Sequence, residues 1–138
     1  MRVEHPSVPI GRTQLDWLLR LAVAGALVGH GAYGAVLAKA SWYDYFAVVG
    51  FSEAMVEAMG LLRIIGGAEI ALGVIALVFP VPALLLLLVA WKIFTELLRP
   101  AAGEPFWEFI ERASNMAAPL VLLHVRGWPR SLAGWLRT

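Results

Sequence analysis

The chain has 138 residues, of which 60% are hydrophobic and 15% are charged, and its formal net charge is +1 at pH 7. Because about a quarter of the residues in a soluble domain are charged, this composition excludes an ordinary soluble domain and predicts a single integral membrane domain. The small net charge argues against a nucleic-acid partner, and the absence of cysteine excludes disulfides, thiol catalysis and Cys-ligated iron–sulfur clusters.

Four apolar segments follow one another along the chain, and each is long enough to cross a bilayer as a helix. They comprise residues 15–37, 59–79, 81–98 and 107–125. Only Phe79-Pro80-Val81-Pro82 separates the second segment from the third, which predicts a tight antiparallel hairpin. The sequence therefore predicts an all-α fold, a four-transmembrane-helix antiparallel bundle over residues 15–126.

The first apolar segment also has features of a secretory signal. Basic residues precede it, and Ala38-Lys39-Ala40 behind it has the small-x-small pattern of a cleavage site. Its apolar run of about 20 residues is too long for the apolar region of a signal peptide, so we expect an uncleaved helix.

The connection between the first two segments carries an aromatic group, Trp42-Tyr43-Asp44-Tyr45-Phe46. We interpret this group as an anchor at the membrane interface, where Trp and Tyr are enriched. The alternatives are a cap over a cavity and a contact for a partner subunit. Further along, Ser52 followed by Glu53 is typical of a helix start, so we expect a short helix leading into the second segment.

The two ends of the chain lie outside the four apolar segments. Residues 1–14 form a predicted tail, and in residues 127–138 the side chains of Trp128, Leu132, Trp135 and Leu136 share one helical face. An apolar face of this kind predicts an interfacial helix at the C-terminus, in contact with membrane lipid.

Arginines set the predicted orientation of the bundle. Four crossings place both ends of the chain and the proline turn on one side of the membrane. That side carries Arg2, Arg12, Arg20, Arg126, Arg130 and Arg137. Acidic residues dilute the basic residues of the opposite loops, so the positive-inside rule places both termini in the cytoplasm.

Small residues at helical spacing predict close packing between helices. The first segment has Gly25 and Gly29, then Gly31 and Gly34, and the second has a stripe that includes Gly66. Such stripes let two helix backbones approach each other in lipid.

Polar residues of the predicted bundle gather in its extracytoplasmic half. The candidate site residues are His30, Arg63, Glu69, Lys92, Glu96, Glu111, Arg112 and Asn115. A charge near the centre of a spanning helix costs at least about 2.5–3.5 kcal/mol when it faces lipid. We therefore expect these side chains to face one another or a wet cavity that opens to the extracytoplasmic side.

Two interpretations of this polar set remain open. In the first, the set binds a quinone headgroup: His30 or Lys92 donates to a carbonyl oxygen, and Glu69 or Glu96 handles a proton. In the second, Lys92–Glu96 and Glu108–Arg112 are i,i+4 ion pairs that join the third and fourth helices. Glu69 has no opposite charge one turn away on its own helix, so it should be protonated unless another helix supplies a partner.

His30 also suggests a haem ligand, with His124 as the second axial ligand. However, about ten residues of rise, roughly 15 Å, separate the two along the predicted bundle. We do not expect haem, and no spacing in the sequence indicates a metal site.

Five short motifs are shared with a known family. They are Leu18-Leu19-Arg20-Leu21, Val28-Gly29-His30-Gly31, Arg63-Ile64-Ile65-Gly66-Gly67-Ala68-Glu69-Ile70-Ala71-Leu72-Gly73, Leu98-Arg99-Pro100 and Glu111-Arg112-Ala113-Ser114-Asn115. With them, residues 15–126 resemble the DoxX-like family of small four-helix membrane proteins.

The resemblance implies a four-helix bundle in the cytoplasmic membrane of a prokaryote. Members of the family are membrane subunits of a thiosulfate:quinone oxidoreductase or partners of redox-defence enzymes. The implied function is a membrane subunit of a redox assembly that engages quinone or a partner oxidoreductase, and no family-wide catalytic set is transferred. The alternatives are a structural subunit of a larger membrane complex and a small lipophile-binding or transport protein. The expected protein partners are other membrane subunits or further copies of the chain.

Overall fold

The computed structural model describes residues 10–138, and this part of the chain is helical without strands. Its elements are α1 (Arg12–Ala35), α2 (Ser41–Val48), α3 (Glu53–Met59), α4 (Leu61–Val78), α5 (Pro82–Ala101), α6 (Phe106–Glu111), α7 (Ala113–Arg126) and a single 3-10 turn, η1 (Ala133–Leu136). The prediction of an all-α fold is confirmed.

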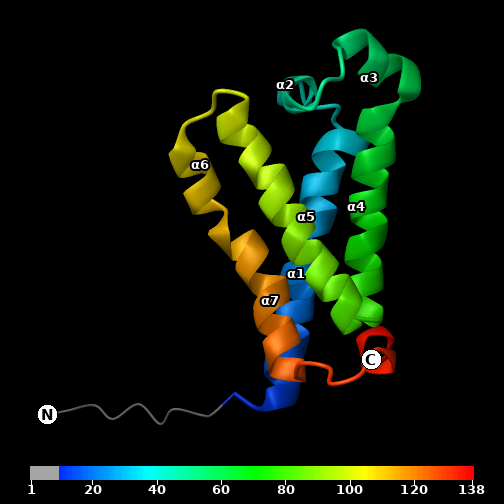
Figure 1. Ribbon diagram of the computed structural model, residues 1–138, viewed down its shortest axis with the longest axis vertical. Helices are drawn as coiled ribbons and strands as arrows, with labels where there is room; N and C mark the ends of the chain where they lie inside the picture. Colours follow the sequence, from blue (N-terminus) through cyan, green and yellow to red (C-terminus); the bar gives the residue numbers. More distant parts are fainter. Residues whose placement is uncertain (1–9) are drawn as a thin grey trace, which may run out of the picture.

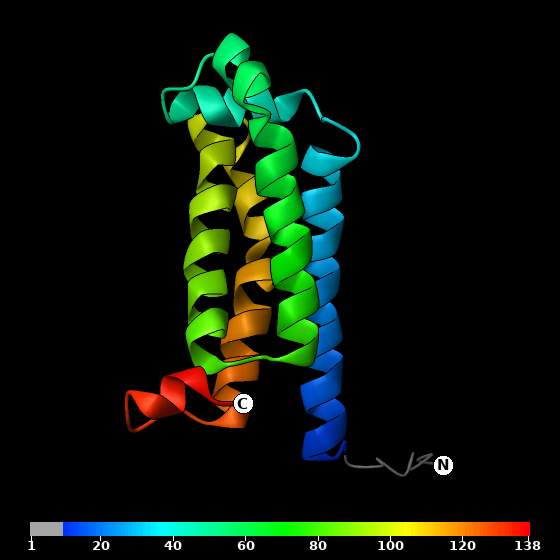
Figure 2. The ribbon, with the colours of Figure 1, turned by 90° about the vertical axis from the view of Figure 1, so that its right-hand side faces the viewer.

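Four long rods run side by side: α1, α4, α5, and α6 followed by α7 (Figures 1 and 2). The short helices α2 and α3 lie across one end of these rods, which we call the loop end. The start of α1, the turn between α4 and α5, and η1 lie at the opposite end, which we call the terminus end. Both described ends of the chain and the proline turn thus share one end, as the sequence predicts.

The rods differ from the predicted segments mainly at their ends. The first begins at Arg12 instead of residue 15, so the predicted tail of residues 1–14 is shortened, and residues 1–9 of it lie outside the described part. The fourth is broken at Arg112, where α6 ends and α7 begins. The aromatic connection forms the helix α2, which the sequence did not predict. The short helix after Ser52 is confirmed, and the Ser52 hydroxyl accepts a hydrogen bond from the Met55 amide at 3.3 Å.

The predicted interfacial helix of residues 127–138 is wrong in extent. Only the turn η1 forms, because Gly127 leaves the helix with φ +99° and Pro129 follows it. Trp128 and Trp135 pack edge to face, with ring centroids 6.2 Å apart, instead of lining one face of a regular helix.

Two of the rods, α1 and α4, are long and apolar enough to cross a membrane by length and composition. Of the other two, α5 has 20 residues but carries Lys92, Glu96 and Arg99, and α7 has 14 residues. Two helices are therefore candidate membrane spans, and the four crossings expected from the sequence stay a prediction.

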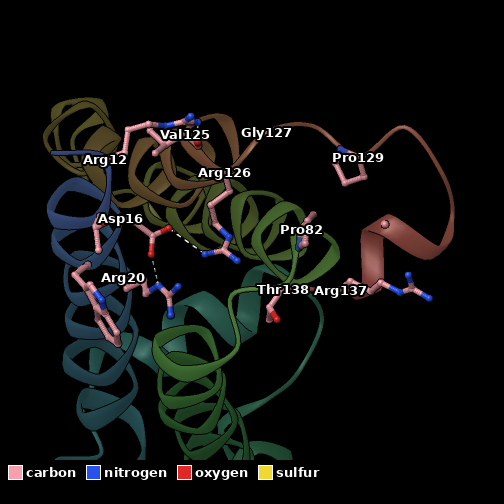
Figure 3. Close-up of a pocket in the computed structure, with 13 residues that line it drawn as sticks. Arg12, Asp16, Arg20, Pro82, Val125, Arg126, Gly127, Pro129, Arg137 and Thr138 are labelled. Atoms are coloured by element: carbon pink, nitrogen blue, oxygen red, sulfur yellow. Dashed lines mark hydrogen bonds and ion pairs between the residues drawn. The ribbon is translucent and has the colours of Figure 1, made fainter.

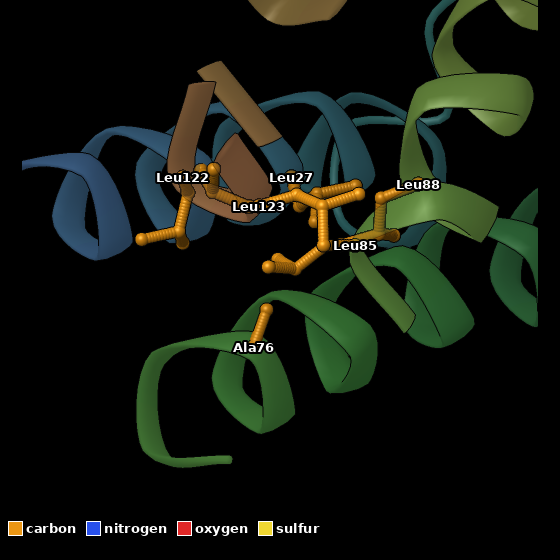
Figure 4. Close-up of a cluster of buried hydrophobic side chains, with 7 residues drawn as sticks. Leu27, Ala76, Leu85, Leu88, Leu122 and Leu123 are labelled. Atoms are coloured by element: carbon orange, nitrogen blue, oxygen red, sulfur yellow. The ribbon is translucent and has the colours of Figure 1, made fainter. Parts of the chain in front are cut away.

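The apolar core lies in the terminus-end half of the bundle, where all four rods meet. It contains Val23, Leu27, Ala76, Leu85, Leu88, Leu122 and Leu123 (Figure 4). Every one of these side chains is at most 2% exposed. Burial of a leucine side chain stabilises the fold by about 1.5–3 kcal/mol, so this core holds the rods together below the polar half.

Glycines bring α1 and α4 into backbone contact. A Cβ atom built on Gly31 would lie 2.4 Å from the Gly66 carbonyl oxygen, and one on Gly66 would lie 2.4 Å from the Ala35 nitrogen. Gly25 and Gly29, also predicted to serve close packing, have nothing within 4 Å of such a Cβ, so that part of the prediction is wrong. The contact uses the Gly31 face of α1 instead.

Candidate functional site

A pocket of about 310 Å³ at the loop end is lined by residues of α1, α2, α4 and α5. Its walls are mainly apolar and aromatic: Trp42, Tyr45, Phe46, Val49, Phe51, Ile65, Trp91, Phe94 and Leu98. The polar lining residues are His30, Glu69 and Thr95. Apolar walls with a few polar groups are typical of small-molecule sites.

Glu69 is the centre of the polar part of this pocket. One carboxylate oxygen, Oε2, lies 2.6 Å from His30 Nδ1. The other, Oε1, accepts hydrogen bonds from Trp91 Nε1 at 2.7 Å and from Lys92 Nζ at 2.9 Å. Glu69 is 0% and Lys92 2% exposed. Two other helices, α1 and α5, therefore supply three partners for one buried carboxylate, as a buried charge requires.

The local sequence explains why these groups meet. Gly31 follows His30 directly and packs on Gly66. This backbone contact brings the His30 side chain within hydrogen-bond distance of Glu69. Gly34, one turn further, leaves the space for the Trp42 ring, because a Cβ there would lie 2.5 Å from that ring. The Trp42 ring in turn covers the His30 ring, with centroids 5.1 Å apart.

A second cluster surrounds Glu96, one turn along α5 from Lys92. Its carboxylate accepts hydrogen bonds from Arg99 Nε at 2.9 Å and from Asn115 Nδ2 at 3.2 Å. Arg112 Nε lies 3.8 Å away, and Arg112 is also paired with Glu108 in the predicted i,i+4 manner. These contacts join α5 to α6 and α7.

Arg99 extends this cluster to α2. Its Nη1 donates to the Tyr45 hydroxyl and to Glu104 Oε2, each at 3.0 Å, and the Tyr45 hydroxyl itself donates to Glu104. Burial raises the pKa of the Glu104 carboxyl, but the hydrogen bonds from Tyr45 and Arg99 outweigh burial and hold this pKa below its usual value of 4.5. Burial and the bond to Glu104 raise the pKa of Tyr45. The triad of Tyr45, Arg99 and Glu104 thus fixes α2 over the pocket.

The lowered pKa of Glu104 predicts a loss of stability in acid. The ionised carboxylate stabilises the folded state fully above the usual pKa of 4.5, and this contribution is lost as the pH falls through the lower folded pKa. We expect the difference in melting temperature between the wild type and Glu104→Gln to be largest near neutral pH and to shrink below about pH 4.5. Thermal unfolding of both proteins across this range measures the effect. Glu111→Gln, at an exposed glutamate, should show no such trend, and a pH-independent Glu104→Gln difference would contradict the prediction.

The structure brings six of the eight candidate residues into these two clusters. They are His30, Glu69 and Lys92 in the first, and Glu96, Arg112 and Asn115 in the second. Arg63 lies on an exposed face of α4, outside both clusters. Glu111 is 73% exposed and lies 3.6 Å from Arg112, so it belongs to the surface.

Two interpretations of charge are corrected. Lys92 is paired with Glu69 and not with Glu96, because a helical side chain leans toward the N-terminus of its helix and Lys92 precedes Glu96. Glu69 has cross-helix partners, so the condition for a protonated Glu69 is not met. His124 is exposed in the last turn of α7, toward the terminus end, whereas His30 lies near the loop end.

Sequence reasoning missed several residues of the pocket. Trp91 was not a candidate, although a buried indole N–H in an apolar helix requires an acceptor. Trp42 and Tyr45 were interpreted as an interface anchor, but they are 5% and 7% exposed and close the pocket. The alternative of a cap over a cavity is the correct one for these two residues.

Comparison with known proteins leaves the geometry of the pocket as the main guide to function. The chain matches no protein-family model, no curated protein and no solved structure. The chemistry on view is an aromatic pocket whose histidine is hydrogen-bonded to a buried carboxylate. Such a pair holds one imidazole nitrogen and leaves the other for a ligand.

Proposed function

We propose that this chain is a DoxX-like membrane subunit of a redox assembly, and that it binds a quinone or quinol in the loop-end pocket. The observation that carries the proposal is the His30–Glu69 pair in a pocket with aromatic walls. Its volume of about 310 Å³ lies at the lower end of the range for small-molecule sites, roughly 300–1,000 Å³. A flat aromatic headgroup suits such walls, because ring faces stack on Trp and Phe.

The proposed location is a prokaryotic cytoplasmic membrane crossed by all four rods, with both termini in the cytoplasm. Large apolar side chains are exposed on the outside of the rods, for example Leu21 at 57%, Ile64 at 58% and Leu87 at 56%. Charged side chains are buried between the rods instead. An apolar exterior around a charged interior suits lipid as the solvent. The rod formed by α6 and α7 covers residues 106–126, which is long enough for a fourth crossing.

His30 is the proposed contact for the reacting end of the ligand. When the Nδ1–H group donates a hydrogen bond to Glu69, the neutral ring presents Nε2 as an acceptor for a quinol hydroxyl. A protonated His30, with the Glu69 carboxylate as its counter-ion, instead donates from Nε2 to a quinone carbonyl oxygen. Oxidation of a quinol releases two protons and two electrons. In this scheme His30 Nε2 takes one proton, the second passes to water at the loop end, and the electron pair passes to the partner oxidoreductase; reduction of the quinone reverses each transfer. Phe94 and Val49, which line the pocket and are exposed at the surface, provide an apolar exit for a lipid tail.

Tryptophan fluorescence tests this function directly, because Trp42 and Trp91 line the pocket. A short-chain quinone added to the purified protein in detergent should quench this fluorescence in a saturable way. We expect His30→Gln to weaken binding about tenfold or more, since a hydrogen bond to a charged group contributes roughly 1.5–3 kcal/mol. The matched control is Arg63→Gln, which changes an exposed residue of the same half of the bundle. Equal binding by the two variants would contradict a role for His30.

A second candidate function is that of a structural subunit without a ligand. The observation in its favour is that Glu69, Lys92, Glu96 and Arg99 all have partners within the bundle. Under this proposal the charges join the rods and the pocket receives a side chain from another subunit. Solvent extraction of the purified protein separates the two: a co-purified quinone supports the first proposal, and dependence on a partner for stable expression without bound quinone supports the second.

A further inference from the structure

We propose that the terminus end of the bundle carries a binding site for an anionic phospholipid, with the phosphate held by arginines and an acyl chain held along α1. The inference depends on the membrane placement proposed above, but it does not depend on quinone binding. It concerns a different pocket, at the opposite end of the rods from the loop-end pocket.

This second pocket has a volume of about 570 Å³ and lies between α1, α7, the start of α5 and the C-terminal segment (Figure 3). Its charged lining residues are Arg12, Asp16, Arg20, Arg126 and Arg137. Figure 3 shows Asp16 between Arg20 and Arg126, with Arg12 beside Val125 and Arg137 pointing outward at the far side. Arg12, Arg20 and Arg126 carry three positive charges against the single negative charge of Asp16, so the pocket favours an anion.

Contacts within the pocket orient these arginines without using all their donors. Asp16 pairs with Arg20 Nε at 2.6 Å and with Arg126 Nη1 at 3.0 Å. Arg12 Nη2 donates to the Val125 carbonyl at 2.9 Å, and Arg20 Nη1 donates to the Leu77 carbonyl at 3.3 Å. A guanidinium carries five N–H donors, so each of these three arginines keeps donors for a ligand.

The fixed positions of the guanidinium groups favour phosphate over a diffuse cloud of counter-ions. The side chains of Arg20 and Arg126 are 14% and 18% exposed, so the surrounding protein restricts them. Two or more planar guanidinium groups can bind the oxygens of one phosphate in a bidentate manner. The chemistry that this pocket recognises is therefore a phosphate group, free or in a lipid headgroup.

An apolar furrow beside the pocket selects a lipid as the ligand. The furrow has a volume of about 420 Å³ and is lined by Ile10, Thr13, Gln14, Trp17, Leu18 and Leu21. Thr13 and Trp17 line both spaces, so the furrow continues from the arginine pocket along α1. Free phosphate would leave this furrow empty, whereas the acyl chain of a phospholipid would cover its apolar surface. Juxtaposed basic and apolar surfaces are also how proteins recognise lipids at the cytoplasmic leaflet.

Thermal unfolding of the purified full chain in an uncharged detergent tests the site. The protein is titrated with phosphatidylglycerol, with phosphatidylcholine, or with inorganic phosphate at matched ionic strength. We expect phosphatidylglycerol to raise the melting temperature at lower concentrations than the other two. Arg12→Gln and Arg126→Gln should each raise the phosphatidylglycerol concentration needed for half of the effect by about fivefold, the usual contribution of one basic residue near an anionic lipid surface.

Two further variants make the test specific. Arg130→Gln is the matched control, because Arg130 is an exposed arginine of the same end that does not line the pocket. Leu18→Gln places a polar group in the furrow and should weaken the effect of phosphatidylglycerol while Arg130→Gln leaves it unchanged. Among residues 10–138 the Arg12 side chain makes one hydrogen bond, to the Val125 carbonyl, so Arg12→Gln keeps the test valid even if Arg126→Gln does not fold.

Three results would overturn the inference. Equal stabilisation by phosphatidylcholine would remove the role of the anionic headgroup. Stabilisation by inorganic phosphate at the same concentrations, with Leu18→Gln unchanged, would reduce the site to one for free anions. A loss in Arg130→Gln as large as that in Arg12→Gln would show a general effect of surface charge. None of these results bears on quinone quenching at the loop end, so the two proposals fail separately.

Discussion

Replacement of Glu69 by alanine is expected to lower the free energy of unfolding by about 3–5 kcal/mol, the usual cost of removing one partner of a buried ion pair. Lys92 is 2% exposed, and Glu69 is its ion-pair partner within residues 10–138. Without Glu69, the ammonium group stays buried and unpaired, and the Trp91 N–H loses its acceptor. Reversible unfolding of the purified protein in mixed micelles, followed by tryptophan fluorescence, measures the change.

A double variant separates the cost of an unpaired charge from the loss of packing. Glu69→Leu combined with Lys92→Met removes both charges, and apolar replacements of a buried ion pair are often neutral or stabilising. We therefore expect the double variant to be more stable than Glu69→Ala. Glu111→Ala is the control, because Glu111 is 73% exposed and such substitutions usually stay within about 0.5 kcal/mol. A Glu69→Ala effect no larger than this control would show that Lys92 and Glu69 are not paired in solution.

Gly66→Ala is expected to destabilise the protein by about 2–3 kcal/mol, at the upper end for overpacking. The added Cβ would lie 2.4 Å from both the Ala35 nitrogen and the Gly31 carbonyl oxygen. These are backbone atoms, so no side-chain rotation relieves the clash and α1 must move away from α4. Because that movement also separates His30 from Glu69, the variant should lose quinone quenching as well as stability. Unfolding and quenching measured on the same preparation test both effects.

The neighbouring residue provides the control for this substitution. A Cβ on Gly67 has no atom within 4 Å, and Gly67 lies in the interior of α4. Gly67→Ala should therefore leave quenching intact and stabilise the helix by up to about 1 kcal/mol, the difference in helix propensity between glycine and alanine. If both variants were equally destabilised, the close contact between α1 and α4 would not be the cause.

The position of Arg63 illustrates what a sequence does not reveal. Arg63 and Glu69 are both predicted site residues on the second apolar segment, but they are six residues apart, and a helix turns about 100° per residue. The two side chains therefore leave α4 in directions about 120° apart. Which of them faces α1 depends on the rotation of α4, and the Gly31–Gly66 contact settles it in favour of Glu69.

In the C-terminal tail and in the fourth rod, the helix is broken at residues where the apolar periodicity of the sequence continues. The apolar spacing of Trp128, Leu132 and Trp135 predicts a helix. However, Gly127 and Pro129 interrupt helical geometry, so only η1 forms. At Arg112 the pattern of residues 107–125 continues while the helix itself is interrupted. Periodicity describes which side chains share a face, and it does not report whether every backbone hydrogen bond is made.

Composition and short-range residue spacing predicted the helical class, the four rods, the proline turn, the helix start at Ser52 and the presence of a polar face on α5. These features depend on composition and on residues close together in the chain. The packing of the helices was needed to show that Glu69 pairs with His30 and Lys92, that α2 covers a pocket, and that Arg12, Arg20 and Arg126 gather around Asp16. Those contacts join residues far apart in the chain, and they depend on the rotation and separation of packed helices, which the spacing of residues along one helix does not fix.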